Sequence, residues 1–398
     1  MNFFLFDPAQ VSRQLQPFTL TRPIALIRVG IFTMAKRWEK LLASKVQVCG
    51  HDVLEKLWPI PVEKAGIWIH PAWVPNEFDA EMVKNLGPNE ALYHDETLLA
   101  WHQDSNSSTM GDHKGHEFSL VRQIPDALII TQPWHIFSQN GKVLRSDFEL
   151  ITIGRISAGL TDPFTQVYGK ENLFIEEGAD IKASVINASE GPVYIGKDAQ
   201  IQEGSVIKGP FALLDHSVVN MGSKMRPDTT IGPFCKVGGE INNAVFFGYS
   251  NKAHDGFLGN SVIGEWCNLG ADTNNSNLKN NYADVKIWSC SERKMVSTGL
   301  QFCGLLMGDH CKTSINSMFN TGTVVGPCSN LFDGGFPPVY VPPFTWGGRL
   351  AGFETYRLDK FLEAEERVYA RRKQVMGEEY KGLLQHLFVR SANETREP

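Results

Sequence analysis

The sequence predicts an α/β domain followed by a parallel β-helix and a C-terminal helical tail. Two observations indicate the β-helix. Aliphatic residues recur every six positions, and a glycine often follows them, as in Ile231-Gly232, Val237-Gly238 and Ile263-Gly264. A helix repeats every 3.6 residues and a strand every 2, so neither explains a period of six. In a hexapeptide β-helix each hexad is one short strand and a turn, with one aliphatic side chain pointing inward.

The six-residue runs are found from Ile175 onward and share their spacing. They are Ile175 and Ile181; Ile195, Ile201 and Ile207; Val219, Met225, Ile231 and Val237; Ile263 and Leu269; and Met318 and Val324. A glycine-rich β-sandwich with chance spacing is the alternative, and the number of in-phase runs disfavours it. A polar excursion from Asn274 to Ser297 interrupts the repeat.

Residues 1–155 are predicted to form the α/β domain. Asn2–Phe6 is an apolar strand, and Thr33–Leu42 has helical spacing. Gly66–Ile69 and Ala127–Thr131 are short apolar runs typical of buried parallel strands. We expect a linker over 156–172, the β-helix over 173–350, and a tail over 351–398. Helical periodicity in the tail predicts a packing or capping helix.

Composition limits the classes of partner. The chain has 398 residues, of which 42% are hydrophobic and 21% charged, and a formal net charge of -6. This balance gives no reason to expect nucleic acid or an anionic membrane as partner. No apolar run approaches the ~18 residues of a membrane span, and the apolar N-terminus is too short for a signal peptide. Seven cysteines without a CxxC pair indicate reduced thiols and a cytoplasmic location.

A histidine-rich stretch lies between His102 and His116. His102, His113 and His116 are the candidate ligands. Their spacing matches no known metal motif. We interpret the stretch as a solvated loop and predict no metal site in the chain.

The block Ser250–Gly259, followed by Val262–Thr273, carries the strongest functional signal. Four short motifs follow one another along this block: Lys252-Ala253-His254, a later Leu-Gly, Ile263-Gly264 and Asn268-Leu269-Gly270-Ala271. The block resembles the acetyltransferase domain of the bifunctional UDP-N-acetylglucosamine pyrophosphorylase/glucosamine-1-phosphate N-acetyltransferase family. It is most similar to the variant form in Bacteroidetes-type bacteria.

The resemblance implies roles for individual residues. His254 would be the general base, since an imidazole is suited to take a proton from an amine near pH 7. Asn268 matches a catalytic-site asparagine. Four further residues would contact the amino-sugar phosphate: Arg226, Lys252, Phe257 and Asn277. Phe257 stands where the family has tyrosine, and the family's phosphate-binding lysine falls near Asn242, which puts the identity of the acceptor in question.

A second resemblance lies near the N-terminus. The segment Pro17–Pro23 with Arg28–Gly30 resembles the start of the sugar-nucleotidyltransferase domain, in which a glycine-rich loop cradles phosphates. This chain has no glycine before Gly30, so nucleotide binding would depend on Arg13 or Arg22. The family's metal-binding aspartate has no clear counterpart. A domain that no longer transfers nucleotides remains an open alternative.

The family further implies a left-handed β-helix, acetyl-CoA as co-substrate, a homotrimer with sites between chains, and UTP with Mg²⁺ if the N-terminal domain is active. The leading hypothesis is N-acetylation of an amino-sugar phosphate. The alternatives are a sugar-1-phosphate nucleotidyltransferase whose β-helix only trimerises and regulates, and a non-enzymatic protein that binds nucleotide sugars.

Overall fold

The computed structural model describes residues 1–104 and 117–394. By its contacts the chain divides into two compact units. The first comprises Met1–Leu15, Thr21–Ile27 and Phe32–Gln132, and the second comprises Gln16–Leu20, Arg28–Ile31 and Pro133–Pro398. The second unit therefore begins before the predicted domain boundary at 155.

The first unit is built on a mixed sheet of order β2-β1-β3-β6-β5-β7. Its strands and helices are β1 (Phe3–Phe6), α1 (Ala9–Gln14), α2 (Met34–Leu42), β2 (Gln47–Cys49), β3 (Gly66–Ile69), β4 (Trp73–Val74), α3 (Glu77–Lys84), β5 (Glu90–His94), β6 (Thr97–Gln103), β7 (Leu120–Gln123) and β8 (Leu128–Ile129). The predicted strands β1 and β3 are parallel neighbours, and Thr33 caps the predicted helix α2 by accepting a hydrogen bond from the Lys36 amide.

One expectation for this unit was wrong, and a second concerns residues that lie partly outside the described ranges. The run Ala127–Thr131 is not a buried parallel strand, because only β8 forms there, half-buried and antiparallel to β4. His102 lies in β6, where its Nδ1 contacts the Leu86 carbonyl at 2.9 Å. His113 and His116 lie outside the described residues.

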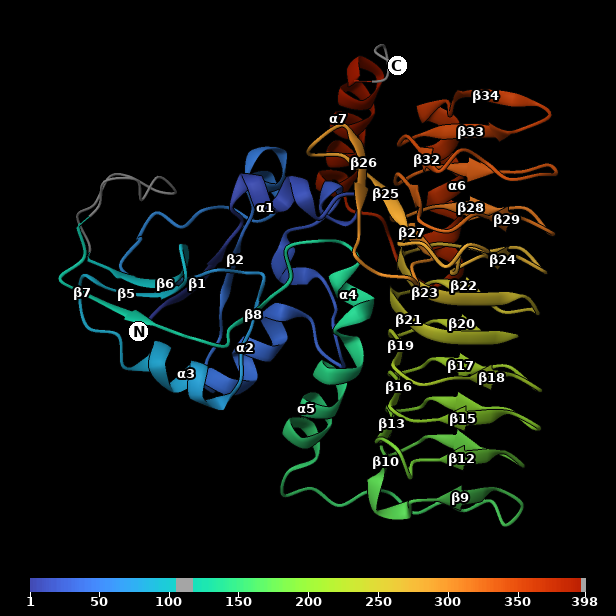
Figure 1. Cartoon of the computed structure of the whole chain (residues 1–398), viewed down its shortest axis with the longest axis horizontal. Helices are drawn as coiled ribbons and strands as arrows, with labels where there is room; N and C mark the ends of the chain where they lie inside the picture. The colour runs from blue at the N-terminus through green and yellow to red at the C-terminus, as the bar shows by residue number, and fades with distance from the viewer. Residues whose placement is uncertain (105–116, 395–398) are drawn as a thin grey trace. The chain divides into compact units, whose positions relative to one another are not determined.

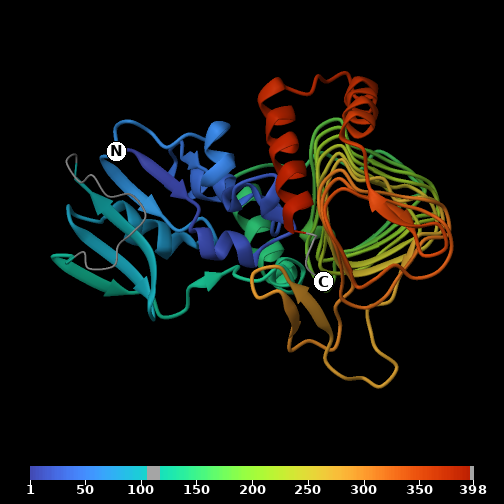
Figure 2. The same cartoon turned by 90° about the horizontal axis from the view of Figure 1, so that it is seen from above.

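The second unit is a parallel β-helix with α4 (His135–Ser138) and α5 (Asn140–Thr152) packed against its strands. The stack runs from β9 to the last coils (Figure 1), and the coils superimpose when viewed along it (Figure 2). The predicted fold class, including the left-handed β-helix, is confirmed.

Each coil contributes strands to three rows. The first row is β10 (Leu173–Ile175), β13 (Val193–Ile195), β16 (Phe211–Leu213), β19 (Thr229–Ile231), β21 (Glu240–Gly248), β23 (Phe257–Glu265), β27 (Leu305–Met307), β30 (Thr323–Val325) and β32 (Tyr340–Val341). The second is β11 (Asp180–Ile181), β14 (Gln200–Ile201), β17 (Val218–Val219), β20 (Lys236–Val237), β22 (Asn251–Lys252), β28 (Lys312–Thr313), β31 (Asn330–Leu331) and β33 (Thr345–Gly348). The third is β9 (Gln166–Tyr168), β12 (Val185–Asn187), β15 (Val206–Lys208), β18 (Lys224–Met225), the first residues of β21 and β23, then β24 (Asn274–Asn275) and β29 (Met318–Phe319).

The aliphatic repeat forms the core, because one inward side chain per strand stacks on its counterpart in the next coil. Val219, Ile231 and Val237 are fully buried. Each such side chain contributes about 1.5–3 kcal/mol by leaving water. The predicted phase is wrong by one residue after the excursion. Phe319 is buried in place of Met318, which is 37% exposed, because the chain re-enters the stack shifted by one position.

The predicted linker over 156–172 is also wrong in part, since β9 already pairs with β12 and begins the stack. The polar excursion contains an antiparallel hairpin of β25 (Lys286–Ser289) and β26 (Lys294–Ser297). The coils differ in length: 18 residues separate Leu213 from its partner Ile231, but 15 separate Ile231 from Phe246 and 17 separate Phe246 from Ile263.

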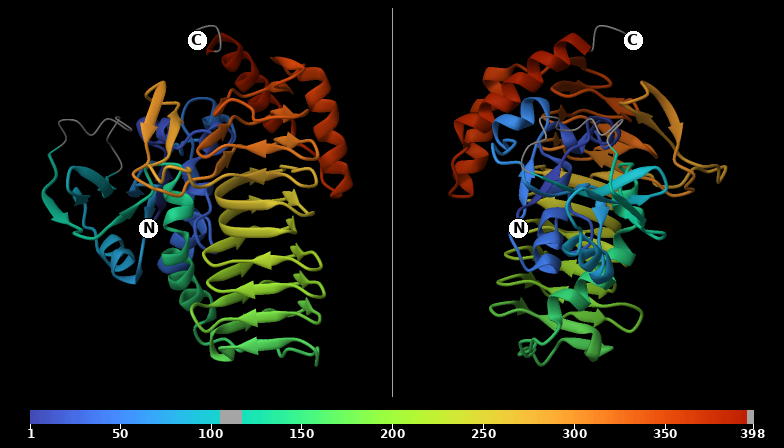
Figure 3. Two further views of the ribbon diagram at one scale, coloured as in Figure 1. Left: turned by 45° about the vertical axis from the view of Figure 1, so that its right-hand side comes forward. Right: turned by 90° about the vertical axis from the view of Figure 1, so that its left-hand side faces the viewer.

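The predicted tail is two helices and not one. A strand β34 (Gly352–Thr355) precedes α6 (Leu358–Arg371) and α7 (Glu378–Glu394). Both helices lie along the last coils (Figure 3), where Phe361, Tyr369 and Leu384 pack against Trp266 and Phe344. The helices therefore cover the outside of the β-helix.

Candidate functional site

One row of outward-facing residues crosses four successive coils. Lys236 pairs with Asn251 between β20 and β22, and single parallel bridges continue the row to Asn268 and Lys312. Successive side chains of a strand point to opposite faces. Because the neighbouring Val237 is fully buried, the row faces outward. We call these four residues the outer row.

His254 lies on the turn that follows β22, at a corner of its coil. It follows the inward-facing residue of its strand, Lys252, by two positions. The residues at the same corner on other coils include Met221, Ala271 and Ile315. Its side chain is exposed. The β-helix therefore presents this imidazole at the surface, where a reactant can reach it.

His254 lines two pockets. The first, which we call the basic groove, has a volume of 570 Å³ and lies between the outer row and α6. Besides His254 and the outer row, Val368, Arg371 and Arg372 line it. His254 and Asn268, the two predicted catalytic residues, thus share one groove.

The second pocket, which we call the corner pocket, has a volume of 460 Å³. His254 lines it together with Asn220, Met221, Asp255 and Asp272. The imidazole therefore stands between a groove lined by cations and a pocket lined by two carboxylates. Such a position suits proton transfer between two reactants that approach from different sides.

Lys252 has a different place from the one predicted. Its side chain is 1% exposed and occupies the inward position that Val237 has on the preceding coil. Its Nζ donates hydrogen bonds to the carbonyl oxygens of His254 at 2.9 Å and Asp255 at 3.1 Å. Burial lowers the pKa of Lys252 to about 8, against the charges of Asp255 and Asp272. Lys252 thus holds the turn that carries His254 and does not face either pocket.

For the acetyl transfer that the family resemblance implies, we expect Lys252→Met to lower kcat about 10-fold with little change in KM, because two charge-assisted hydrogen bonds to the turn are lost. The ammonium carries its charge in the folded protein below about pH 8 and loses it above. The wild-type rate should therefore decline above about pH 8, and the variant should lack this decline. Thermal denaturation checks that the variant is folded. An unchanged kcat would show that the turn needs no such anchor.

The other predicted sugar contacts gather on a different face. Arg226 donates to Glu240, with 3.0 Å between Nη1 and Oε1, and Glu240 is the register partner of Phe257. Asn277 donates to Asn260 Oδ1 at 2.8 Å. None of the three predicted residues Arg226, Phe257 and Asn277 lines either pocket at His254.

The predicted nucleotide contacts lie in the first unit. Arg13 is exposed on α1, whereas Arg22 is buried. The segment after β1 forms α1 instead of a loop with free amides. Both carboxylate oxygens of Asp7, at the end of β1, accept from the Ile24 amide at 3.0 Å. Burial raises the pKa of Asp7, although His51 and the Ile24 amide oppose the rise.

Among residues 1–104 and 117–394, no group of three His, Cys, Asp or Glu side chains is placed to hold a metal ion. All seven cysteines are free thiols. None of the helices in the described part of the chain has the length and apolar character of a membrane span.

Sequence reasoning missed the contribution of α6. In the sequence, Arg371 and Arg372 look like part of an ordinary charged helical face. Arg372 lies 121 residues from Asn251, to which its Nη2 donates at 3.0 Å. No local pattern reports such a contact, although the unpaired basic end of the helix was a visible signal.

Comparison with known proteins finds one family model and several similar proteins. Residues 3–156 match the family model described as sugar nucleotidyl transferase. The predicted family resemblance is confirmed. A bifunctional sugar-1-phosphate nucleotidylyltransferase/acetyltransferase of Sulfurisphaera tokodaii is 29% identical over 147 residues, which are 36% of this chain and 36% of that protein.

Further matches concern shorter segments or the fold alone. The bifunctional protein GlmU of Methanocaldococcus jannaschii is 32% identical over 104 residues, 26% of this chain and 25% of that protein. A solved structure of the polySia-specific acetyltransferase NeuO has 13% identity and a TM-score of 0.29, and the match covers 53% of this chain and 95% of that one. The chain spans only about a third of the length of the Sulfurisphaera relative.

Proposed function

We propose that this protein transfers an acetyl group from acetyl-CoA to the amine of an amino-sugar phosphate, with His254 as general base. The observation that carries the proposal is the exposed His254 between two pockets, one of which also contains Asn268. The names of the similar bifunctional proteins support the reaction class.

In the proposed reaction the acceptor amine attacks the thioester carbonyl of acetyl-CoA. A new C–N bond forms, the C–S bond breaks, and the thiolate leaves. His254 takes the proton that the amine loses and returns it to the thiolate, so that the imidazole ends neutral. Asn268 orients a reactant by hydrogen bonding from the wall of the groove.

A coupled assay tests this proposal. Protein is mixed with acetyl-CoA, glucosamine-1-phosphate and UTP, and the release of thiol and of pyrophosphate is followed separately. We expect thiol release that depends on the amino sugar. Pyrophosphate release without thiol release would instead favour a nucleotidyltransferase with a structural β-helix.

Nucleotidyl transfer is a second candidate activity, because residues 3–156 match the sugar nucleotidyl transferase model. We propose that it transfers nucleotides poorly. The closed segment after β1, with α1 and the buried Asp7, supports this view. The coupled assay tests this proposal through the release of pyrophosphate, which we expect to be slow. Robust pyrophosphate release that is unchanged in Arg13→Ala would contradict the proposal.

We also propose a homotrimer in the cytoplasm, and the seven free thiols agree with that location. At the same corner, two coils before and two coils after His254, stand Met221, 71% exposed, and Ile315, 65% exposed. Large exposed apolar side chains mark interaction surfaces when they gather. A neighbouring copy over this corner would cover them and complete the site at His254.

Sedimentation of the wild type should therefore give a trimer at micromolar concentration. Met221→Asp combined with Ile315→Asp should dissociate it and lower activity in parallel. Val375→Asp is the control, since Val375 is 90% exposed but lies far along the chain, after α6. A stable monomer of 44.4 kDa in the wild type would refute the trimer.

A further inference from the structure

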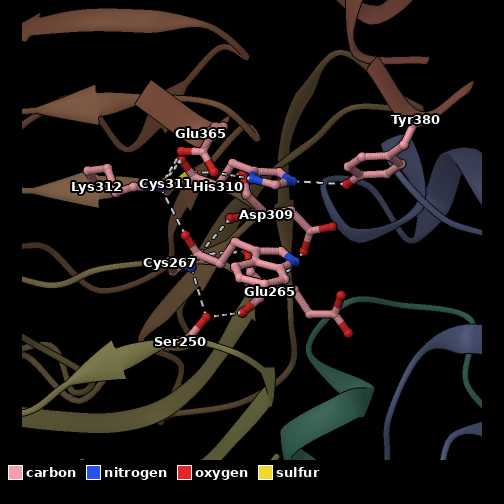
Figure 4. A network of polar contacts seen from close by, with 12 residues as sticks. Ser250, Glu265, Cys267, Asp309, His310, Cys311, Lys312, Glu365 and Tyr380 are labelled. Atoms are coloured by element: carbon pink, nitrogen blue, oxygen red, sulfur yellow. Dashed lines mark hydrogen bonds and ion pairs between the residues drawn. The ribbon is translucent and has the colours of Figure 1, made fainter. Parts of the chain in front are cut away.

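Helix α6 is fastened to the β-helix by a buried ionic network. Glu365 accepts from His310 Nδ1 at 2.7 Å and from Lys312 Nζ at 2.7 Å (Figure 4). On the other side of the imidazole, Nε2 lies 3.0 Å from the Tyr380 hydroxyl of α7. Glu365 is 2% exposed. The helix is thus held in a defined position on these coils.

The end of α6 is held as well. Tyr369 stacks on Trp266 with ring centroids 4.0 Å apart, and Arg372 donates to Asn251 of the outer row. These contacts place the last turn of α6 over the outer row. Arg371 and Arg372 consequently become the second wall of the basic groove.

The groove carries uncompensated positive charge. Its lining contains Lys236, Lys312, Arg371 and Arg372 but no Asp or Glu. Lys312 is paired with Glu365, whereas within the described ranges no ion pair is found for Lys236 or Arg371. Guanidinium groups bind phosphate oxygens in a bidentate way. A groove of 570 Å³ lies in the size range of small-molecule sites.

We propose that α6 forms the donor side of the active site and that Arg371 and Arg372 bind the phosphate groups of the acyl donor. This inference rests on the proposed acetyl transfer. His254, which lines the same groove, then meets the thioester, while the arginines hold the phosphate-bearing part. The C-terminal helices are accordingly part of the site and not only a cap.

Donors with and without phosphates test the proposal. Arg371→Ala and the double variant with Arg372→Ala should raise KM for acetyl-CoA about 10- to 100-fold per arginine, as expected for lost hydrogen bonds to a charged group. KM for acetyl-pantetheine, which lacks phosphate, and KM for the acceptor should not change. Arg371→Lys should recover part of the loss.

The matched control is Arg367→Ala, which removes an arginine of the same helix that is paired with Glu363 outside the groove. An equal rise in KM for both donors, or a rise for the sugar phosphate alone, would overturn the inference. Calorimetry with CoA separates it from the proposed function. If wild type binds CoA, Arg371→Ala loses that binding, and no acetyl transfer occurs, then the inference stands and the proposed reaction fails.

Discussion

Replacing His254 with alanine is expected to lower the rate of acetyl transfer from acetyl-CoA by about two to four orders of magnitude, the usual contribution of a general base. The trimer should survive, because the side chain is exposed at a coil corner and contributes nothing to the aliphatic core. The release of thiol from acetyl-CoA provides the readout.

Two matched variants sharpen this prediction. His216→Ala removes another exposed corner histidine, which stacks on Phe234 at 4.8 Å and lines neither pocket at His254. It should leave the rate unchanged. Asn268→Ala should have a smaller effect than His254→Ala, in line with an orienting role. If His254→Ala acetylates within a few-fold of wild type, the general-base mechanism is excluded.

The second large effect is expected for Glu365→Ala. Removing this carboxylate leaves the Nδ1 of His310 without its acceptor and Lys312 without its counter-charge. Breaking a buried ionic pair in this way costs about 3–5 kcal/mol. We expect the free energy that holds α6 and α7 on the β-helix to fall by this amount. Hydrogen exchange of the amides in α6 and α7 measures it, and the strands of the β-helix should stay protected.

Glu363→Gln is the matched control on the same helix. Glu363 is exposed and pairs with Lys360 and Arg367, so its replacement should change stability by no more than about 0.5 kcal/mol. Because α6 carries the arginines of the basic groove, Glu365→Ala should also weaken the binding of CoA. Protection of α6 at the wild-type level in Glu365→Ala would show that the apolar contacts alone hold the helix.

The same network predicts a response to acid. Burial opposes the charge on Glu365, but the charges of Lys312 and His310 and their hydrogen bonds outweigh it and lower the pKa of the carboxyl. Such a group contributes stability above its unfolded pKa of about 4.3 and loses it as the pH falls through the lower folded value. Acid titration by near-ultraviolet circular dichroism should therefore show release of α6 and α7 below about pH 4. Glu365→Gln should already lack this stabilisation at neutral pH.

The period of the aliphatic residues was enough to predict the β-helix, because stacked coils require one inward side chain at every sixth position. Ile195, Ile201 and Ile207 follow this rule without exception. The rule failed where an insertion breaks the phase, so that Phe319 and not Met318 enters the core. The histidine motif likewise placed His254 and Asn268 together, since both positions lie within two adjacent coils.

Only the tertiary structure shows which residues far apart in the sequence contact one another. The sequence could not tell that Lys252 turns inward to hold the turn of His254, because a lysine at a coil position is usually solvated. Nor could it place α6, whose Arg372 meets Asn251 over 121 residues of chain. Local periodicity determines which face of an element is apolar. Which two faces meet depends on the packing of the whole unit, and that packing brings the arginines of α6 into the groove beside His254.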